Sequence, residues 1–265
     1  MNKRITLICI LFAVIPSLSW AQGTDNDLET DFGARVSASV DKKITKGFHW
    51  SVDGEARMSD NLSDFGRYQV GTGLSYKVTP WLKVGAGYIY IQKKNSSDEW
   101  KARHRVYGDA TLSYKTGNWR FALKERVQLT HKDVGNAYQS TPNSVMLKSR
   151  FKVSYKASKV LTPYGYVELR NVFNDPACSA TWSTTSQAYS DYVFNGYTDT
   201  YFNRYRGSIG LEWKLNKRNS LDFFVLGDYC YDKDIDTNAK GTKLKSLTYD
   251  RAFNTAIGIG YQFSF

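Results

Sequence analysis

The C-terminal segment of the chain alternates strictly between two kinds of side chain. From Ile257 to Phe265, every odd position is apolar and every even position is glycine, glutamine or serine. Because successive side chains of a β-strand point to opposite faces, this pattern predicts a strand that separates an apolar environment from a polar one. The same period recurs along the chain from residue 32 onward, so it constrains the whole fold.

Period-two segments dominate the chain, and no convincing amphipathic helix is found. Eleven strands are predicted, at residues 32–40, 48–58, 66–78, 81–91, 103–115, 119–130, 145–156, 162–173, 201–215, 221–231 and 249–265. Each reaches the ~9 to 11 residues that a tilted strand needs to cross a bilayer. We therefore predict an all-β protein with a single antiparallel transmembrane β-barrel.

The connections between these strands fall into two classes. Tight turns are predicted at 77–80, 116–118, 157–159 and 216–220. Longer polar segments alternate with them, at 92–102, 131–144, 174–200 and 232–248. Outer-membrane barrels show this alternation, with short periplasmic turns and long extracellular loops.

The predicted strand number conflicts with the usual parity of such barrels. If the last strand runs toward the periplasm, counting back through eleven strands makes the first strand run the same way. Bacterial single-chain barrels have an even number of strands. We therefore favour about twelve strands, with ten as the alternative. The odd count means that residues 22–31 hold a further strand or enter the lumen, or that one predicted strand is false.

The N-terminus has the pattern of a secretory signal peptide. Lys3 and Arg4 precede an apolar run at 5–15, and small residues at 19–21 follow it. The run is about half the ~20 residues of a membrane-spanning helix. We predict a signal peptide at 1–21 and a barrel domain at 22–265 in the bacterial outer membrane. The mature chain keeps a net charge of +9, because cleavage removes two of the eleven excess positive charges.

The alternation alone does not say which face lies inside, because a soluble lipocalin-like barrel has the same period with apolar residues inward. One face carries dense charge, as at Lys148, Arg150 and Lys152, which favours a polar lumen and an apolar exterior. Tryptophans also lie near the short turns, where interfacial aromatic residues of membrane barrels gather: Trp81, Trp119 and Trp213.

With these faces assigned, the predicted lumen is mainly basic. The expected basic lining is Arg120, Lys124, Arg126, Lys148, Arg150, Lys152, Arg204 and Arg206. The expected acidic residues are Asp53, Glu55, Glu168, Glu212, Asp222 and Asp228. An open lumen of this kind attracts anions, because a low-dielectric wall focuses the field of one charge sign. In a closed lumen the same residues form an ion-paired plug, since small barrels are mostly filled by side chains.

One charged residue falls on the apolar face. Glu125 has the same parity as Phe121, Leu123 and Val127, which places it near the middle of the lipid-facing side. A charged side chain at the bilayer midplane costs about 2 to 4 kcal/mol for Arg or Lys, and less for Glu. Either a bulge turns Glu125 inward or a neighbouring basic residue pairs with it.

Two further groups of residues were considered as sites. His49 and Ser51 are two positions apart on one strand face, as in the His-x-Ser pair of outer-membrane lipid hydrolases. They share that face with Asp53 and Glu55, away from lipid, so a non-enzymatic role is favoured. Cys178 and Cys230 both fall toward the loops, where a disulfide between them or two free thiols are the alternatives. No metal site or cofactor is indicated.

Several segments resemble a family of small Gram-negative outer-membrane β-barrels catalogued as a domain of unknown function. The segments are Arg67-Tyr68, 73–76 with 81–88, Pro163-Tyr164 with Glu168, and 204–210 leading into 211–213. The resemblance implies a barrel without an assigned ligand and carries over no catalytic residues. The terminal Phe265 also resembles the recognition tail of outer-membrane barrels, which implies contact with the barrel-assembly machinery.

These observations favour a monomeric channel for small anionic solutes. A plugged barrel with a structural or adhesive role is the alternative, and a lipid-modifying hydrolase is the third. Contact with outer-membrane lipid and lipopolysaccharide is expected. Nucleic acid is not an expected partner, because no recognised nucleic-acid-binding module accompanies the basic charge.

Overall fold

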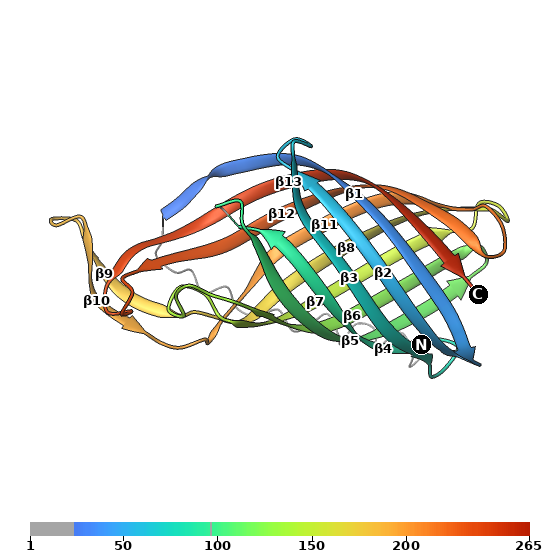
Figure 1. Ribbon diagram of the computed structural model, residues 1–265, viewed down its shortest axis with the longest axis horizontal. Helices are drawn as coiled ribbons and strands as arrows, with labels where there is room; N and C mark the ends of the chain where they lie inside the picture. The colour runs from blue at the N-terminus through green and yellow to red at the C-terminus, as the bar shows by residue number, and fades with distance from the viewer. Residues whose placement is uncertain (1–23, 96) are drawn as a thin grey trace, which may run out of the picture.

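The computed structural model describes residues 24–95 and 97–265, which are built from strands and their connections (Figure 1). The predicted signal peptide at 1–21 lies outside these residues. No helix in the described ranges is long and apolar enough to span a membrane. The strands are β1 (Thr24–Thr45), β2 (Phe48–Ser59), β3 (Asp64–Lys77), β4 (Leu82–Lys94), β5 (Trp100–Thr116), β6 (Trp119–Lys132), β7 (Asn143–Tyr155), β8 (Leu161–Asp175), β9 (Cys178–Ser183), β10 (Ala188–Phe194), β11 (Asp199–Lys214), β12 (Asn219–Thr237) and β13 (Leu244–Ser264).

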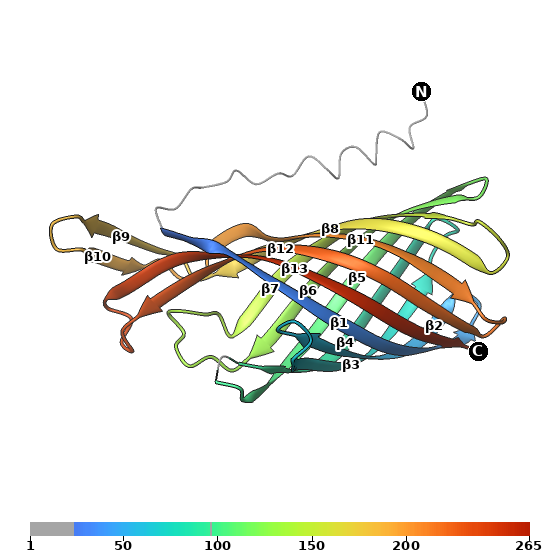
Figure 2. The same cartoon turned by 90° about the horizontal axis from the view of Figure 1, so that it is seen from above.

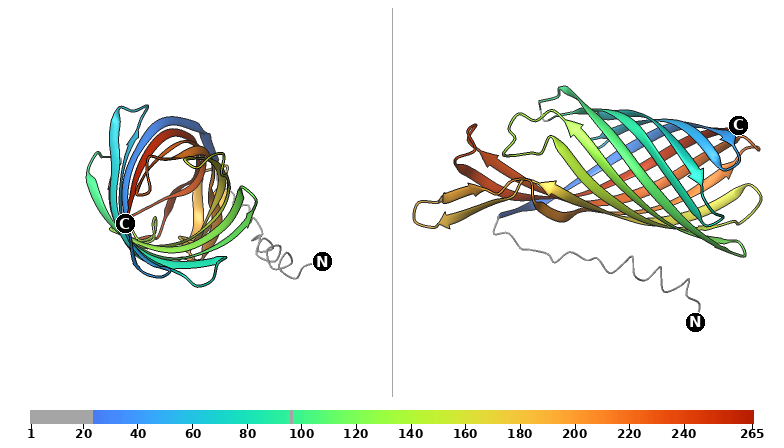
Figure 3. Two further views of the ribbon diagram at one scale, coloured as in Figure 1. Left: turned by 90° about the vertical axis from the view of Figure 1, so that its right-hand side faces the viewer. Right: turned by 90° about the horizontal axis from the view of Figure 1, so that it is seen from below.

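Eleven of the described strands form one closed barrel, which confirms the predicted fold class. Their order around the barrel is β1-β13-β12-β11-β8-β7-β6-β5-β4-β3-β2, and β9 and β10 form a separate two-stranded sheet. The end-on view in Figure 3 shows the strands surrounding a single axis. The barrel therefore has eleven strands, close to the twelve favoured from parity.

The odd number is possible because the barrel closes through a parallel seam. β1 pairs with β13 in parallel from Thr24↔Thr248 to Asp41↔Ser264, whereas the other neighbouring pairs are antiparallel. Residues 24–31 continue β1 and form no strand of their own. At the end of the seam, Lys43 N donates to Phe265 O at 2.9 Å and Phe265 N donates to Asp41 O at 3.0 Å. The C-terminal strand thus has hydrogen-bonded neighbours on both sides.

The two ends of the barrel differ in their connections. One end, here called the turn end, carries Phe265 and the connections 46–47, 78–81, 117–118, 156–160 and 215–218. Gly47 makes the tightest of them possible with a left-handed φ of 80°. The opposite end, here called the loop end, carries the connections 60–63, 95–99, 133–142, 176–198 and 238–243 (Figure 3).

Two of the predicted loops are partly strand. β12 and β13 stay paired up to Thr237↔Leu244, through most of the segment 232–248. The segment 174–200 contains the hairpin β9–β10, which projects at the loop end (Figure 2). The extended strands bury Ile235, Leu244 and Leu247, against which β9 and β10 pack Cys178, Ala180, Tyr189 and Tyr192. This small apolar core explains why pairing continues beyond the predicted strand ends.

Polar contacts connect the loop-end segments to one another. The Lys233 ammonium, on β12, donates to the Pro176 carbonyl at 2.6 Å and pairs with the Asp199 carboxylate at the base of the β9–β10 hairpin. From the loop 133–142, Asn136 Nδ2 donates to Thr237 Oγ1 at 3.1 Å and Gln139 Nε2 donates to Asp236 Oδ1 at 2.8 Å. The loop 133–142, the β12–β13 hairpin and the β9–β10 hairpin are therefore connected to one another by polar contacts.

The outer surface of the barrel is apolar. Its middle carries aliphatic side chains that point away from the barrel, such as Ile209 at 70 % exposed and Val167 at 58 %. Trp81, Trp119 and Trp213 are exposed at the turn end. Toward the loop end an exposed aromatic cluster is formed by Phe65, Tyr68 and Trp100, with the rings of Tyr68 and Trp100 centred 5.3 Å apart. An aliphatic band flanked by aromatic residues is typical of the exterior of a transmembrane barrel.

Glu125 keeps its place on this outer surface. The β6–β7 register runs without a shift through Glu125↔Ser149, so no bulge turns the side chain inward. Its carboxylate accepts a hydrogen bond of 2.6 Å from Ser149 Oγ. A neighbouring hydroxyl, rather than a bulge or a basic residue, therefore compensates the buried carboxylate.

Candidate functional site

The inner face of the barrel is identified by contacts that reach over an intervening strand. Arg35 on β1 pairs with Asp228 on β12, although β13 lies between these strands. Lys152 on β7 pairs with Glu212 on β11 at 2.7 Å, across β8. Such contacts are possible only on the concave side of a cylinder. The charged parity of the strands therefore faces the lumen.

The middle of the lumen is crossed by a network of buried ion pairs, which we call the central belt. Arg206 Nη2 donates to Asp228 Oδ2 at 2.7 Å, and Arg206 Nη1 lies 3.8 Å from Glu168 Oε1. Arg150 Nη2 lies 2.6 Å from Glu168 Oε2, and Arg35 Nη2 lies 3.3 Å from Asp228 Oδ2. The Asp228 and Glu168 side chains are only 3 % and 4 % exposed. The belt narrows the lumen and fixes its members by charge-assisted hydrogen bonds.

From the middle of the lumen to its turn end, further ion pairs join the strands. The Asp109 carboxylate binds Arg126 at 2.6 Å and Lys124 at 3.1 Å. The Tyr164 hydroxyl donates to Asp222 at 2.9 Å. Arg120 is exposed and donates to Ser113 at 3.2 Å. In this part of the lumen, carboxylates accompany most of the cations.

Toward the loop end, like charges lie directly opposite one another on neighbouring strands. In the first cationic row, the register pairs Arg35 with Arg57, Arg57 with Arg67, and Arg67 with Lys93. In the second cationic row, it pairs Arg126 with Lys148, Lys148 with Arg170, and Arg170 with Arg204. Directly opposed like charges destabilise a sheet. Eight cations in this arrangement therefore cost folding free energy.

Several of these cations have no carboxylate partner. Among the described residues, five cations form no salt bridge within 4.0 Å: Arg67, Lys93 and Lys148 of the rows, and Arg103 and Arg105 on β5. The buried Nε atoms of Arg67, Arg103 and Arg204 also have no hydrogen-bond acceptor. The loop-end half of the lumen thus holds uncompensated guanidinium groups.

The predicted lining residues that form ion pairs in the lumen do not come together at one site. Glu168, Arg150 and Arg206 belong to the central belt, while Lys152 and Glu212 pair nearer the turn end. Glu55 pairs with Arg57. Lysines and arginines of the loop-end half were missed, although the same alternation on the predicted strands would have placed several of them inward: Arg35, Arg57, Arg67, Arg103, Arg105 and Arg170.

The candidate hydrolase pair lies in the lumen near the turn end. His49 Nδ1 is 2.8 Å from Asp41 Oδ1. The Ser51 hydroxyl donates to the Gly73 carbonyl at 3.5 Å. Between His49 and Ser51 the described residues show no hydrogen bond. The two side chains are thus engaged with other partners.

Both cysteines of the described chain are free thiols. Cys178 lies in β9 within the loop-end apolar core, whereas Cys230 is buried on the lumen face of β12, within 3.8 Å of Asn254 Nδ2. Of the two alternatives, a disulfide and two free thiols, the structure has the free thiols. No cluster of three or more His, Cys, Asp or Glu within residues 24–95 and 97–265 has the geometry to hold a metal ion.

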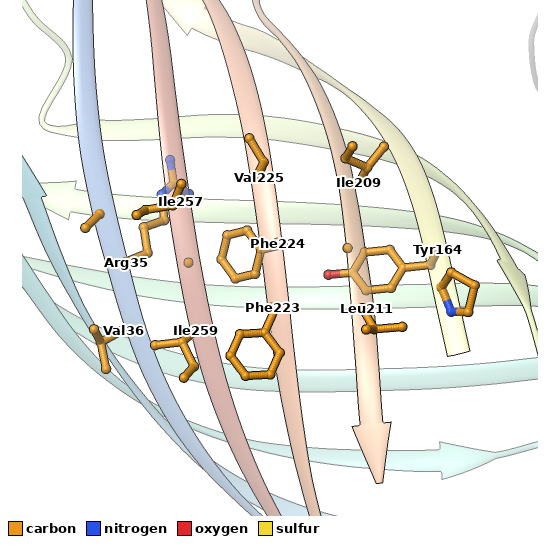
Figure 4. Close-up of a pocket in the computed structure, with 14 residues that line it drawn as sticks. Arg35, Val36, Tyr164, Ile209, Leu211, Phe223, Phe224, Val225, Ile257 and Ile259 are labelled. Carbon is orange, nitrogen blue, oxygen red and sulfur yellow. The ribbon is translucent and has the colours of Figure 1, made fainter. Parts of the chain in front are cut away.

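A shallow groove of about 720 Å³ lies over β1, β13, β12 and β11 on the outside of the barrel (Figure 4). Its walls are aliphatic and aromatic side chains such as Ile209, Phe223 and Ile257, with glycine backbone at Gly210 and Gly258. The groove is suited to hydrocarbon, and the polar chemistry of the molecule lies in the lumen.

The sequence matches a family model described as "Protein of unknown function (DUF2490)" over residues 32–239. No curated protein matches the chain.

Proposed function

Because the chain belongs to the DUF2490 family of proteins of unknown function, we propose its role from the lumen: an outer-membrane β-barrel that admits and passes small anions. The opposed cations of the loop-end half carry this proposal. A fold that places cations directly opposite one another, and leaves several of them without carboxylates, retains them at the expense of stability. Uncompensated cations in a low-dielectric wall concentrate anions and exclude cations.

The outer-membrane location is part of the proposal. The aliphatic band with its aromatic girdles supports contact with lipid acyl chains, and the basic loop-end residues support contact with lipopolysaccharide. Phe265 is half exposed at the end of β13, where the barrel-assembly machinery would meet it. In this orientation the loop end faces outward from the cell and the turn end faces the periplasm.

The central belt favours a second candidate, in which the barrel is plugged and acts as a structural or adhesive surface protein. Its carboxylates are almost fully buried, and apolar side chains also fill the lumen, including Ile91, Val172 and Leu226. The projecting β9–β10 hairpin would be the contact surface of such a protein. The two candidates differ in whether ions cross the belt.

Conductance in planar bilayers distinguishes the two candidates. We expect steady conductance from the purified full-length mature protein, with a reversal potential that shows preference for chloride over potassium in a salt gradient. Lys245→Gln removes a positive charge from an exposed residue outside the lumen and should leave the ion selectivity unchanged. Silence at high protein density would refute the channel and favour the plugged barrel.

A non-enzymatic role is also proposed, because His49 and Ser51 are engaged with other partners. Lipid hydrolysis by the purified protein that disappears in His49→Ala would overturn it.

A further inference from the structure

Seven cations line the loop-end half of the lumen, and five of them form no salt bridge within 4.0 Å among the described residues. We define the arginine cage as Arg67, Lys93, Arg103, Arg105, Lys148, Arg170 and Arg204. In the strand register, Arg67 lies opposite Lys93, Lys148 lies opposite Arg170, and Arg170 lies opposite Arg204. Arg103 and Arg105 are on β5, between these two groups in the order of strands around the barrel, so the cage cations follow one another along the inner wall.

The groups of the cage are poorly satisfied by the protein itself. Arg170 and Arg204 reach carboxylates only at 3.8 Å, at Asp232 and Asp228, and Arg170 Nε donates to the neutral amide oxygen of Asn203 at 2.6 Å. Arg105 Nε donates to the neutral hydroxyl of Thr130 at 2.9 Å. Three buried Nε–H groups, on three different strands, lack acceptors. A buried donor without an acceptor costs free energy, and the oxygens of an anion would supply the missing acceptors.

We propose that the arginine cage is a binding site for soluble anions that carry two or more linked phosphate groups. Guanidinium forks bind phosphate oxygens bidentately, and donors arriving from several directions suit tetrahedral phosphoryl groups better than one planar carboxylate. Each phosphate group carries about −1.5 to −2 charges, so at least two groups are needed to approach the cage's excess of positive charge.

The arginine cage lies between the central belt and the loop 133–142. The central belt adjoins it toward the turn end, where Asp228 binds both Arg204 and Arg206. At the loop end, Lys132 lies opposite Arg103 in the β5–β6 register and donates to Ser140 Oγ of the loop 133–142 at 2.6 Å. An anion entering from the loop end therefore meets the cage before the belt. The inference rests on the proposed function only in requiring that anions enter this end of the lumen.

Titration calorimetry in detergent micelles tests the inference with inorganic pyrophosphate as the probe. We expect pyrophosphate to bind with an affinity at least tenfold higher than that of orthophosphate or a dicarboxylate such as succinate. Arg67→Gln and Arg103→Gln should each weaken pyrophosphate binding about tenfold. Arg218→Gln, at an exposed residue of the turn-end connection 215–218, is the matched control and should leave binding unchanged. Equal, weak binding of all three anions would overturn the proposal.

Chemical protection of the unmodified protein provides a readout that does not depend on whether the variants fold. Pyrophosphate should slow the phenylglyoxal modification of Arg103 and Arg204, mapped by mass spectrometry, while Arg218 reacts at its unprotected rate. Equal reaction rates with and without pyrophosphate would refute the site. Anion-selective conductance without this protection would overturn the cage and leave the channel standing, whereas protection without conductance would support the cage within a plugged barrel.

Discussion

Neutralising Asp228 isolates the contribution of the central belt. Asp228→Asn keeps the shape of the side chain, so no cavity is formed. The change leaves Arg206, Arg35 and Arg204 near one another with Glu168 as the remaining carboxylate. Removing one partner of a buried ion pair costs about 3 to 5 kcal/mol, because the other charge stays buried without compensation. We expect a loss of about 4 kcal/mol in the free energy of unfolding.

The assay is urea unfolding of the barrel in lipid vesicles, followed by tryptophan fluorescence, with gel mobility before and after boiling as a check on folding. The double variant Asp228→Asn with Arg206→Met removes the uncompensated charge together with its partner. Its loss should therefore be clearly smaller than the sum of the two single losses. A loss below about 1 kcal/mol for Asp228→Asn, or additive single losses, would refute the view that the belt is held by buried charge pairing.

Three further predictions concern other parts of the molecule. Glu125→Leu should stabilise the barrel in lipid by about 1 to 2 kcal/mol, because it removes a carboxylate from the aliphatic band, whereas Ser149→Ala should destabilise it by about 1 kcal/mol, because it removes the hydrogen-bond donor to that carboxylate. The urea midpoints of both variants in vesicles measure these changes, and a destabilised Glu125→Leu would contradict the prediction. Lys233→Met should loosen the β9–β10 hairpin, because Asp199 and the Pro176 carbonyl lose their hydrogen-bond donor. Amide hydrogen exchange in residues 178–194 should become faster while that of β6 stays unchanged. Equal exchange in the wild type and the variant would contradict this prediction. Burial raises the pKa of the Cys178 thiol, so its alkylation at pH 8 should be slower than that of cysteine in solution and should accelerate at higher pH. Mass spectrometry without reductant should find Cys178 and Cys230 as free thiols, and a mass lower by two hydrogens would show a disulfide instead.

The barrel architecture is predictable from sequence because its cause is local. A transmembrane strand must expose apolar side chains to lipid and polar ones to the lumen, and the period of two records this at each residue. The inward direction of Arg150 and Glu168 follows from it directly. The inward direction of Arg103 and Arg105 follows in the same way when the period of two is applied to β5.

Other features depend on contacts that the local pattern does not contain. The alternation of β1 is the same whether its neighbour is parallel or antiparallel. This pattern therefore does not predict the pairing of β1 with β13 or the odd number of strands. The extension of β12 and β13 beyond their predicted ends depends on Ile235 and Leu247 packing against a distant hairpin. Compensation of Glu125 by Ser149 depends on the β6–β7 register, which fixes residues 24 positions apart.

The parallel seam determines at which ends of the barrel β1 begins and β13 finishes. β1 starts at the loop end, whereas Phe265 ends β13 at the turn end. An epitope inserted just ahead of β1 and another fused after Phe265 would thus be reached by antibodies from opposite sides of the bilayer. The seam also joins the earliest strand made to the latest one, so the cylinder stays open along one side until synthesis of the whole polypeptide is finished.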